Sequence, residues 1–283
     1  MKFLLSLVFL IAAVCFRARG QDAAETAAIV AEGKRLYRAE MASWHGTDLF
    51  LATFKEQQEN IGGYFSYVHK DRTNCIFFDK SATPRVLATI AFDSTYTAGN
   101  AQIDSSPRGF TSNENDLYAI RRQALDAVNQ DTLFRTYQNA NLNLIPLING
   151  AERKVYVLTG PKTGKVVLFG NDYLLRFDLN NKLVGRRRLH QNLIPMNYGQ
   201  QLPEGQQVVS AMHAHLPASG DYITATDICT LMLYSRFAQW KQHYVLSKNY
   251  VSIWDCEKNN LLVFTRKAWD QMGAGERKKA NRK

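Results

Sequence analysis

Two histidines stand one residue apart in the stretch from Val208 to Pro217, at positions 213 and 215. The residues before them, from Val208 to Met212, form a short apolar run that is typical of a buried strand. Side chains alternate between the two faces of a strand, so His213 and His215 should point the same way, about 7 Å apart along the chain. Two imidazoles at that spacing can bind one metal ion.

A helix should follow the histidine strand after a loop that contains Pro217 and Gly220. Thr224 or Thr226 can cap this helix, and Asp227 falls in its first turn, where the helix dipole favours a carboxylate. Two neutral imidazoles, one carboxylate and a water in the fourth position form a typical ligand set for one catalytic Zn²⁺ per chain. We therefore predict His213, His215 and Asp227 as metal ligands.

These residues also allow other interpretations. Asp221 is an alternative ligand, and the two histidines could instead only hydrogen-bond at a sheet edge. Single histidines elsewhere in a chain are usually hydrogen-bonded polar groups without a metal. That interpretation applies to the remaining four, which are His45, His69, His190 and His243.

The same stretch resembles the signature of the JAMM (MPN-plus) metalloprotease family, which is His-x-His, about seven residues opening with proline, and Ser-x-x-Asp. Here eight residues separate His215 from Thr224. One extra residue, Leu216, explains both that length and the late position of Pro217. The resemblance implies that His213, His215 and Asp227 bind zinc. It also implies that Thr224, in the place of the serine, donates a hydrogen bond to a developing oxyanion.

Hydrolysis also needs a carboxylate that accepts a proton from water and passes it to the leaving amine. The resemblance implies a glutamate on an early strand, often in a Glu-x-x-Gly setting, and Glu59-Asn60-Ile61-Gly62 matches that pattern. Glu59 lies 213 − 59 = 154 residues before His213. The alternatives are that Glu59 is a surface charge at a helix end, or that Glu40 or Glu204 is the base.

The first part of the mature chain, residues 21–141, should contain helices and a small antiparallel meander. Apolar residues at helical spacing predict a helix from Glu25 to Met41, and Thr47 can start a second helix after an interruption at residues 44–46. Short apolar runs separated by turn residues then predict the strands of the meander. We also expect this part to supply some of the core of the second part.

From Leu142 onward the sequence consists of short apolar runs separated by tight turns, which predicts an antiparallel sheet continued by the histidine strand. The fold class is therefore α+β, mainly antiparallel sheet with flanking helices. The resemblance places a JAMM-like core in residues 142–272, and residues 273–283 form a basic tail.

The first twenty residues have the pattern of a signal peptide. Lys2 precedes an apolar run from Phe3 to Phe16, and Ala18-Arg19-Gly20 offers a small-x-small cleavage site. The run is too short to span a membrane, and the rest of the chain has no other long apolar segment. We expect export to the periplasm or the exterior, with no transmembrane segment.

The formal net charge of the chain is +10, and removing Lys2, Arg17 and Arg19 leaves +7. The aromatic residues do not interleave with the basic clusters at residues 186–188 and 278–283, so we predict no nucleic-acid partner. Three cysteines remain after cleavage, and the settings of Cys75 and Cys229 suggest small buried hydrophobic residues.

These observations predict an exported zinc-dependent hydrolase of amide or isopeptide bonds that acts on a peptide or protein substrate. The alternative is a non-catalytic MPN-like binding or scaffold protein of the cell envelope. A third reading is a structural protein without a metal.

Overall fold

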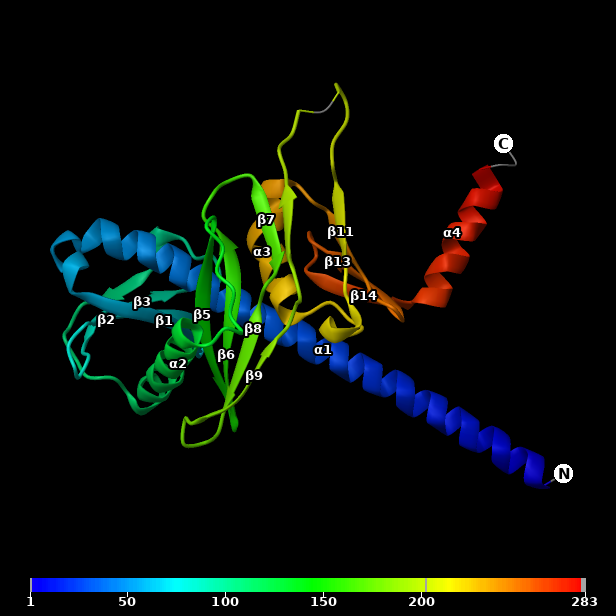
Figure 1. The fold of residues 1–283 in the computed structure, drawn as a ribbon, viewed down its shortest axis with the longest axis horizontal. Coiled ribbons are helices and arrows are strands. Elements are labelled where there is room, and N and C mark those ends of the chain that lie inside the picture. Colours follow the sequence, from blue (N-terminus) through cyan, green and yellow to red (C-terminus); the bar gives the residue numbers. More distant parts are fainter. Residues whose placement is uncertain (1, 202, 281–283) are drawn as a thin grey trace.

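The computed structural model describes residues 2–201 and 203–280, which form an α+β fold built mainly from antiparallel sheets (Figure 1). This confirms the predicted fold class. The helices are α1 (Lys2–Thr53), α2 (Ser112–Gln130), α3 (Ala225–Ala238) and α4 (Arg266–Ala280), and the short 3₁₀ helices are η1 (Lys55–Asn60), η2 (Ala98–Asn100) and η3 (Pro217–Ser219).

Three sheets have four strands each, and a separate antiparallel pair joins β7 (Val166–Gly170) to β10 (Leu193–Asn197). The first sheet contains β1 (Ile61–His69), β2 (Arg72–Asp79), β3 (Val86–Phe92) and β4 (Gln102–Asp104) in that order. The second has the order β5 (Ala140–Asn149), β6 (Glu152–Pro161), β8 (Tyr173–Phe177) and β9 (Leu183–Arg188). The third has the order β11 (Ser210–Ala214), β12 (Gln242–Leu246), β13 (Tyr250–Asp255) and β14 (Asn260–Thr265).

The first helix, α1, is continuous from Lys2 to Thr53, so the predicted interruption at residues 44–46 was wrong. Gly46 is buried inside the helix, where a Cβ atom would lie 2.9 Å from both the Cβ and the Sγ of Cys75. The glycine therefore allows α1 to approach β2 closely. The predicted signal peptide, apart from residue 1, lies in the first part of α1, and its removal stays a prediction.

We expected the histidine strand β11 to continue the sheet of residues 140–188, and this was wrong. It starts the third sheet and pairs in parallel with β12, with His213 opposite Val245. Parallel neighbours need a crossover connection, and α3 supplies it between β11 and β12. This β–α–β unit is the part of the fold that brings the histidine strand beside the first turn of α3.

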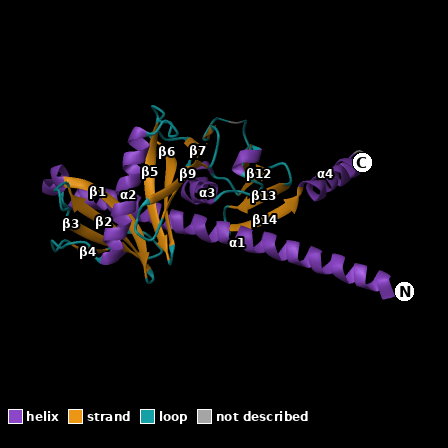
Figure 2. Cartoon of the chain, turned by 60° about the horizontal axis from the view of Figure 1, so that its bottom comes forward, coloured by secondary structure: helices purple, strands orange, loops and turns teal. Residues whose placement is uncertain are grey.

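Helix α1 runs along both parts of the molecule and packs against α3 (Figures 1 and 2). One hydrophobic cluster contains Leu36 and Phe50 of α1, Phe77 of β2, Leu174 of β8 and Leu233 of α3. The apolar core is thus shared between residues 21–141 and residues 142–272. The two predicted regions meet in this common core.

Cys75 and Cys229 are buried, as predicted, and Cys256 is partly buried; none of the three is in a disulfide. Within the described residues, we find no helix that combines the length and the apolar character needed to cross a membrane.

The contact between α1 and α3 yields a stability prediction. A Cβ atom on Gly33 would lie 2.7 Å from two carbons of Ile228 and 3.0 Å from the Ala225 carbonyl oxygen. Overfilling a packed contact costs about 1–3 kcal/mol. We therefore expect Gly33→Leu to lower the free energy of unfolding by about 1–3 kcal/mol in urea denaturation. Lys34→Leu, at the next and exposed position of α1, is the control and should change it little. Equal effects of the two substitutions would contradict this packing role.

Candidate metal centre

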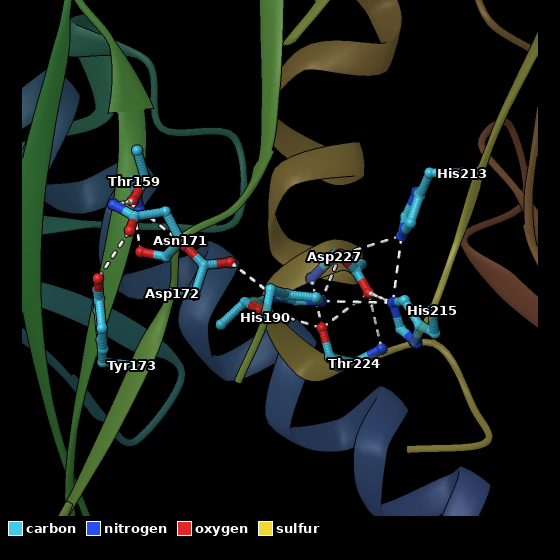
Figure 3. Close-up of polar contacts among 10 residues, drawn as sticks. Thr159, Asn171, Asp172, Tyr173, His190, His213, His215, Thr224 and Asp227 are labelled. Atoms are coloured by element: carbon cyan, nitrogen blue, oxygen red, sulfur yellow. Dashed lines mark hydrogen bonds and ion pairs between the residues drawn. The ribbon is translucent and has the colours of Figure 1, made fainter. Parts of the chain in front are cut away.

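The backbone of β11 positions the two histidines that the sequence singled out. His213 lies in β11, and His215 follows one residue after Ala214, the last residue of the strand. The His215 amide donates to the Leu246 carbonyl at 2.8 Å, which continues the parallel pairing with β12. Both residues are 6–7% exposed. The two imidazoles share one face of the strand, as predicted, and lie beside α3 (Figure 3). The apolar run before them is not the buried strand that we predicted, because Val208, Val209 and Met212 are 53%, 40% and 62% exposed and β11 begins only at Ser210.

Asp227 is fully buried in the first turn of α3, where a capping box with Thr224 fixes it. The Thr224 side chain accepts a hydrogen bond from the Asp227 amide at 3.1 Å. The Asp227 Oδ2 atom in turn accepts from the Thr224 amide at 2.9 Å and from the Thr224 hydroxyl at 2.8 Å. These three hydrogen bonds at the start of the helix leave the carboxylate little freedom.

A third histidine, His190, joins the cluster from the residues that follow β9. The β8–β9 pairing continues beyond the strand, since the Leu189 amide donates to the Asp172 carbonyl at 2.8 Å. His190 is 4% exposed, and its Nε2 atom lies 3.4 Å from Asp227 Oδ1. The sequence interpretation of His190 as an ordinary polar group missed this site, because its neighbours are assembled only by packing.

The Nε2 atom of His215 occupies the centre of the cluster (Figure 3). It lies 3.3 Å from His190 Nε2, 3.2 Å from His213 Nε2 and 3.1 Å from Asp227 Oδ2. One imidazole nitrogen carries either one proton or one lone pair, so it cannot satisfy all three neighbours. The Oδ1 atom of Asp227 is buried and accepts no hydrogen bond. These unmatched polar atoms are the arrangement that a cation would relieve.

The spacing of the donor atoms fits a metal ion. His190, His215 and Asp227 each offer one ligand atom, and these atoms lie within 4.8 Å of one another. A tetrahedral zinc ion with bonds of about 2.0–2.1 Å separates its donor atoms by about 3.3 Å. The distances of 3.1–3.4 Å within this group are close to that edge length. The buried His-His-Asp group could therefore hold a metal ion.

His213 provides a second set with the same size. Its Nε2 atom is 3.2 Å from His215 Nε2 and 3.6 Å from Asp227 Oδ1. His215 and Asp227 thus belong to both sets, and the third ligand is either His190 or His213. The sequence prediction named His213, and the geometry adds His190 as an equal candidate.

Further polar groups lie behind the outer nitrogens of His213 and His190. His213 Nδ1 is 2.8 Å from His243 Nε2, and His190 Nδ1 is 3.5 Å from the buried Asp172 Oδ2. A carboxylate behind a histidine is common in metal sites, where it orients the ring and makes the nitrogen more basic. Asp172 is held in turn by the Thr159 amide, which donates to its Oδ1 at 2.9 Å.

Burial and neighbouring charges set the protonation of the cluster. Burial lowers the pKa of His213 to about 4 and that of His243 to about 3, so both rings are neutral at pH 7. Burial also opposes the charge on His190, but the Asp227 and Asp172 carboxylates raise its pKa to about 10. Although burial disfavours its ionised form, Asp227 has a pKa well below the usual value because His190 and His213 lie beside it. Without a metal, His190 carries the compensating positive charge.

Glu59, the predicted catalytic base, does not lie near this cluster. It is exposed in η1, which follows the end of α1. α1 packs on the first turn of α3 at Gly33 and then continues for twenty residues to Thr53. At 1.5 Å per residue this is about 30 Å. The sequence matches the Glu-x-x-Gly pattern, but the structure places Glu59 beyond the far end of α1 from the first turn of α3.

The alternative residues also lie outside the cluster. Asp221 accepts two hydrogen bonds from Asn249, at 3.0 and 3.1 Å, and Glu204 is exposed. Glu40 accepts from Asn143 at 2.9 Å and lines a different cavity. Thr224 is at the site, but its hydroxyl is occupied by Asp227.

No family model, curated protein or solved structure matches the chain. The site must therefore be judged on its own geometry.

The donor geometry predicts metal binding. We expect about one divalent metal ion per chain in elemental analysis after reconstitution with zinc, because the donor atoms of the buried side chains lie at the spacing of metal ligands. His215→Ala should lose the metal, since His215 belongs to both candidate ligand sets. His69→Ala, at an exposed histidine of β1, should keep it.

Thermal unfolding gives a second readout for the same site. An ion that binds only the folded chain stabilises it by about 2.7 kcal/mol at 100 times its dissociation constant. Zinc should therefore raise the Tm of the unmodified chain and of His69→Ala, and leave that of His215→Ala unchanged. A protein that takes up no metal and shows no shift would exclude the site.

Proposed function

We propose that this chain is an exported zinc-dependent hydrolase of amide or isopeptide bonds. One observation carries the proposal, namely the convergence of three imidazole Nε2 atoms on the fully buried Asp227 carboxylate. Imidazole suits zinc and related transition metals better than it suits magnesium or calcium, which prefer oxygen ligands. Zinc fits a site with two or three histidines and one carboxylate.

The order of local elements supports the hydrolase class. A strand with His213 and His215, a loop, and a capped helix with Asp227 follow one another, and α3 returns the chain to a parallel strand. This is the arrangement that the sequence resemblance to the JAMM family implies around its zinc ligands. The extra residue, Leu216, falls between β11 and η3, where an insertion disturbs neither element.

We assign His213, His215 and Asp227 as the ligands and His190 as the proton acceptor. The His213 ring is neutral and is backed by another neutral ring, His243, as a metal ligand requires. His190 is instead backed by a carboxylate, Asp172, which stabilises an imidazolium. This assignment replaces Glu59, which cannot reach the cluster.

The chemistry divides between the ion and the side chains. A zinc ion at this position would acidify water and polarise the carbonyl group of an amide. With an ion balancing the charge of Asp227, His190 would be neutral, and its Nε2 atom would take the proton from the attacking water and return it to the leaving nitrogen. Asp172 would keep Nδ1 of His190 protonated and its ring oriented. Thr224, whose hydroxyl donates to Asp227, would position that ligand and would not bind the oxyanion directly.

A cavity of about 650 Å³ lies beside the cluster and could admit a substrate. Its walls include Leu189, which precedes His190, and the loop from Pro217 to Ala225, which joins His215 to α3. Cavities of roughly 300–1,000 Å³ are usual for ligand sites. Its lining carries charges of both signs, as a cavity for peptide groups would.

The low exposure of the cluster favours a second candidate function. The side chains of His190, His213 and His215 are 1–5% exposed, and that of Asp227 is fully buried. Structural metal sites are closed in this way, whereas catalytic ones keep an open position. The alternative is therefore a non-catalytic MPN-like scaffold protein of the cell envelope that retains the metal for stability.

Replacing His190 tests the catalytic assignment. We expect the zinc-loaded chain to hydrolyse a mixed peptide digest or a γ-glutamyl-Nε-lysine isopeptide. Mass spectrometry of the products measures this hydrolysis. His190→Gln should keep about one zinc per chain. It should lower the hydrolysis rate by about 10²–10⁴-fold, the usual contribution of a general base. A chelator should abolish the activity and zinc should restore it.

Glu59→Gln is the control and should leave both the metal content and the rate unchanged. If His190→Gln loses the metal, then His190 is a ligand and the base assignment fails. Zinc binding without hydrolysis of either substrate, in every variant, would instead support the scaffold function.

A further inference from the structure

A second cavity, of about 520 Å³, lies between α1, β5, the turn after β6, and α3. It shares no residue with the metal cluster. Asp227 lies in the first turn of α3, and Phe237, ten residues further along, lines this cavity. At 1.5 Å per residue, about 15 Å of helix separates the two sites.

The cavity has an acidic group that lacks a counter-ion. The Glu40 carboxylate accepts a hydrogen bond from Asn143 Nδ2 at 2.9 Å, and among the residues that the structure describes it forms no ion pair. Burial raises the pKa of the Glu40 carboxyl to about 7, and the hydrogen bond from Asn143 only partly opposes this. A buried carboxylate without a counter-ion costs folding free energy, and a bound cation would recover it.

The charged and titratable groups around Glu40 come from several elements. Tyr64 of β1, Tyr234 and Cys229 of α3, and Cys75 of β2 all feel its charge, and their own pKa values are raised by burial first. They remain neutral near pH 7. Asp48 of α1 also lines the cavity, as does the exposed Lys162, whose Nζ donates to the Gln138 carbonyl at 3.3 Å.

Aromatic side chains form much of the remaining wall. The ring centroid of Trp44 lies 6.4 Å from that of Tyr234 and 6.3 Å from that of Phe237. Trp44 is 39% exposed and Phe237 is 44% exposed, but the Arg236 guanidinium already lies over the Phe237 ring, 4.6 Å from its centroid. Trp44, with Tyr234 beside it, is therefore the exposed ring of this cavity. The faces of aromatic rings attract cations, and Trp attracts them most strongly.

We propose that this cavity binds an organic ammonium group, with Glu40 as its counter-charge and Trp44 and Tyr234 as its aromatic wall. The combination of an acid without a counter-ion and open ring faces favours a cation with an apolar surface over an anion or an inorganic ion. The group could belong to a small quaternary ammonium compound or to a lysine side chain. Both present the same chemistry.

Isothermal titration calorimetry of the full chain can test this with matched probes. Choline represents the quaternary group, and Nα-acetyl-lysine methylamide represents the lysine side chain. The neutral isostere 3,3-dimethyl-1-butanol has the shape of choline without its charge. At pH 8 we expect at least one of the two cations to bind tenfold or more tightly than the neutral isostere. The cation that binds more tightly identifies the ligand as a quaternary ammonium compound or as a lysine side chain.

The dependence on pH follows from Glu40. A cation favours the ionised carboxyl, so below about pH 7 binding must also expel a proton, and the affinity should fall by up to tenfold per pH unit. Glu40→Gln should weaken binding at pH 8 by tenfold or more and remove this pH dependence. Glu56→Gln, at an exposed acid in η1, is the matched control and should bind like the unmodified chain.

Circular dichroism establishes that each variant is folded. Should Glu40→Gln fail to fold, Trp44→Ala at an exposed position of α1 replaces it and should weaken binding severalfold. Equal affinity for choline and its neutral isostere would overturn the proposal. So would the absence of binding by both cations, or unchanged binding by the variants.

Discussion

The structure depends on the burial of one negative charge. The Asp227 carboxylate is removed entirely from water, and an isolated carboxylate in such a place would be protonated or would unfold its surroundings. Three imidazole rings surround it instead. The positive charge on His190 compensates it in the absence of a metal, and a divalent ion would do so more completely. Much of the surrounding architecture serves to keep these four side chains together.

Each of these side chains is held by a different kind of backbone restraint. A helix cap fixes Asp227, a parallel strand pair fixes His213 and His215, and a continued antiparallel pair fixes His190 beside Asp172. The close approach of α1 at Gly33 then presses the first turn of α3 into place. The distances between the donor atoms differ by only a few tenths of an ångström. A shift in the helix cap, in either strand pair or in α1 would therefore disturb the site.

Local patterns in the sequence predicted the local parts of this arrangement. The alternation around His213 and His215 gave their common face, and the Thr224–Asp227 spacing gave the capped helix. His190 and Asp172 could not be found in this way, because their contact arises from strand pairing and from packing between sheets. The pairing of β11 with β12 was missed for the same reason.

Two errors came from residues whose meaning depends on their neighbours. Gly46 was interpreted as a helix break, but it allows a close contact with Cys75 inside a continuous helix. Glu59 was assigned as a base from a four-residue pattern, although such a pattern contains no information about where the chain will place it. Predictions from helical and strand periodicity agreed with the structure, whereas these predictions from single residues or short motifs did not.

The shared position of α1 has a consequence for how the chain could be divided. The inner face of α1 completes the apolar core of the first sheet and also the core beneath α3. Residues 142–272 therefore lack a complete core without α1. Residues 142–272 expressed alone would expose the surface that Leu36 and Phe50 cover. We therefore expect the two regions to unfold together, and residues 142–272 to be unstable as a separate module.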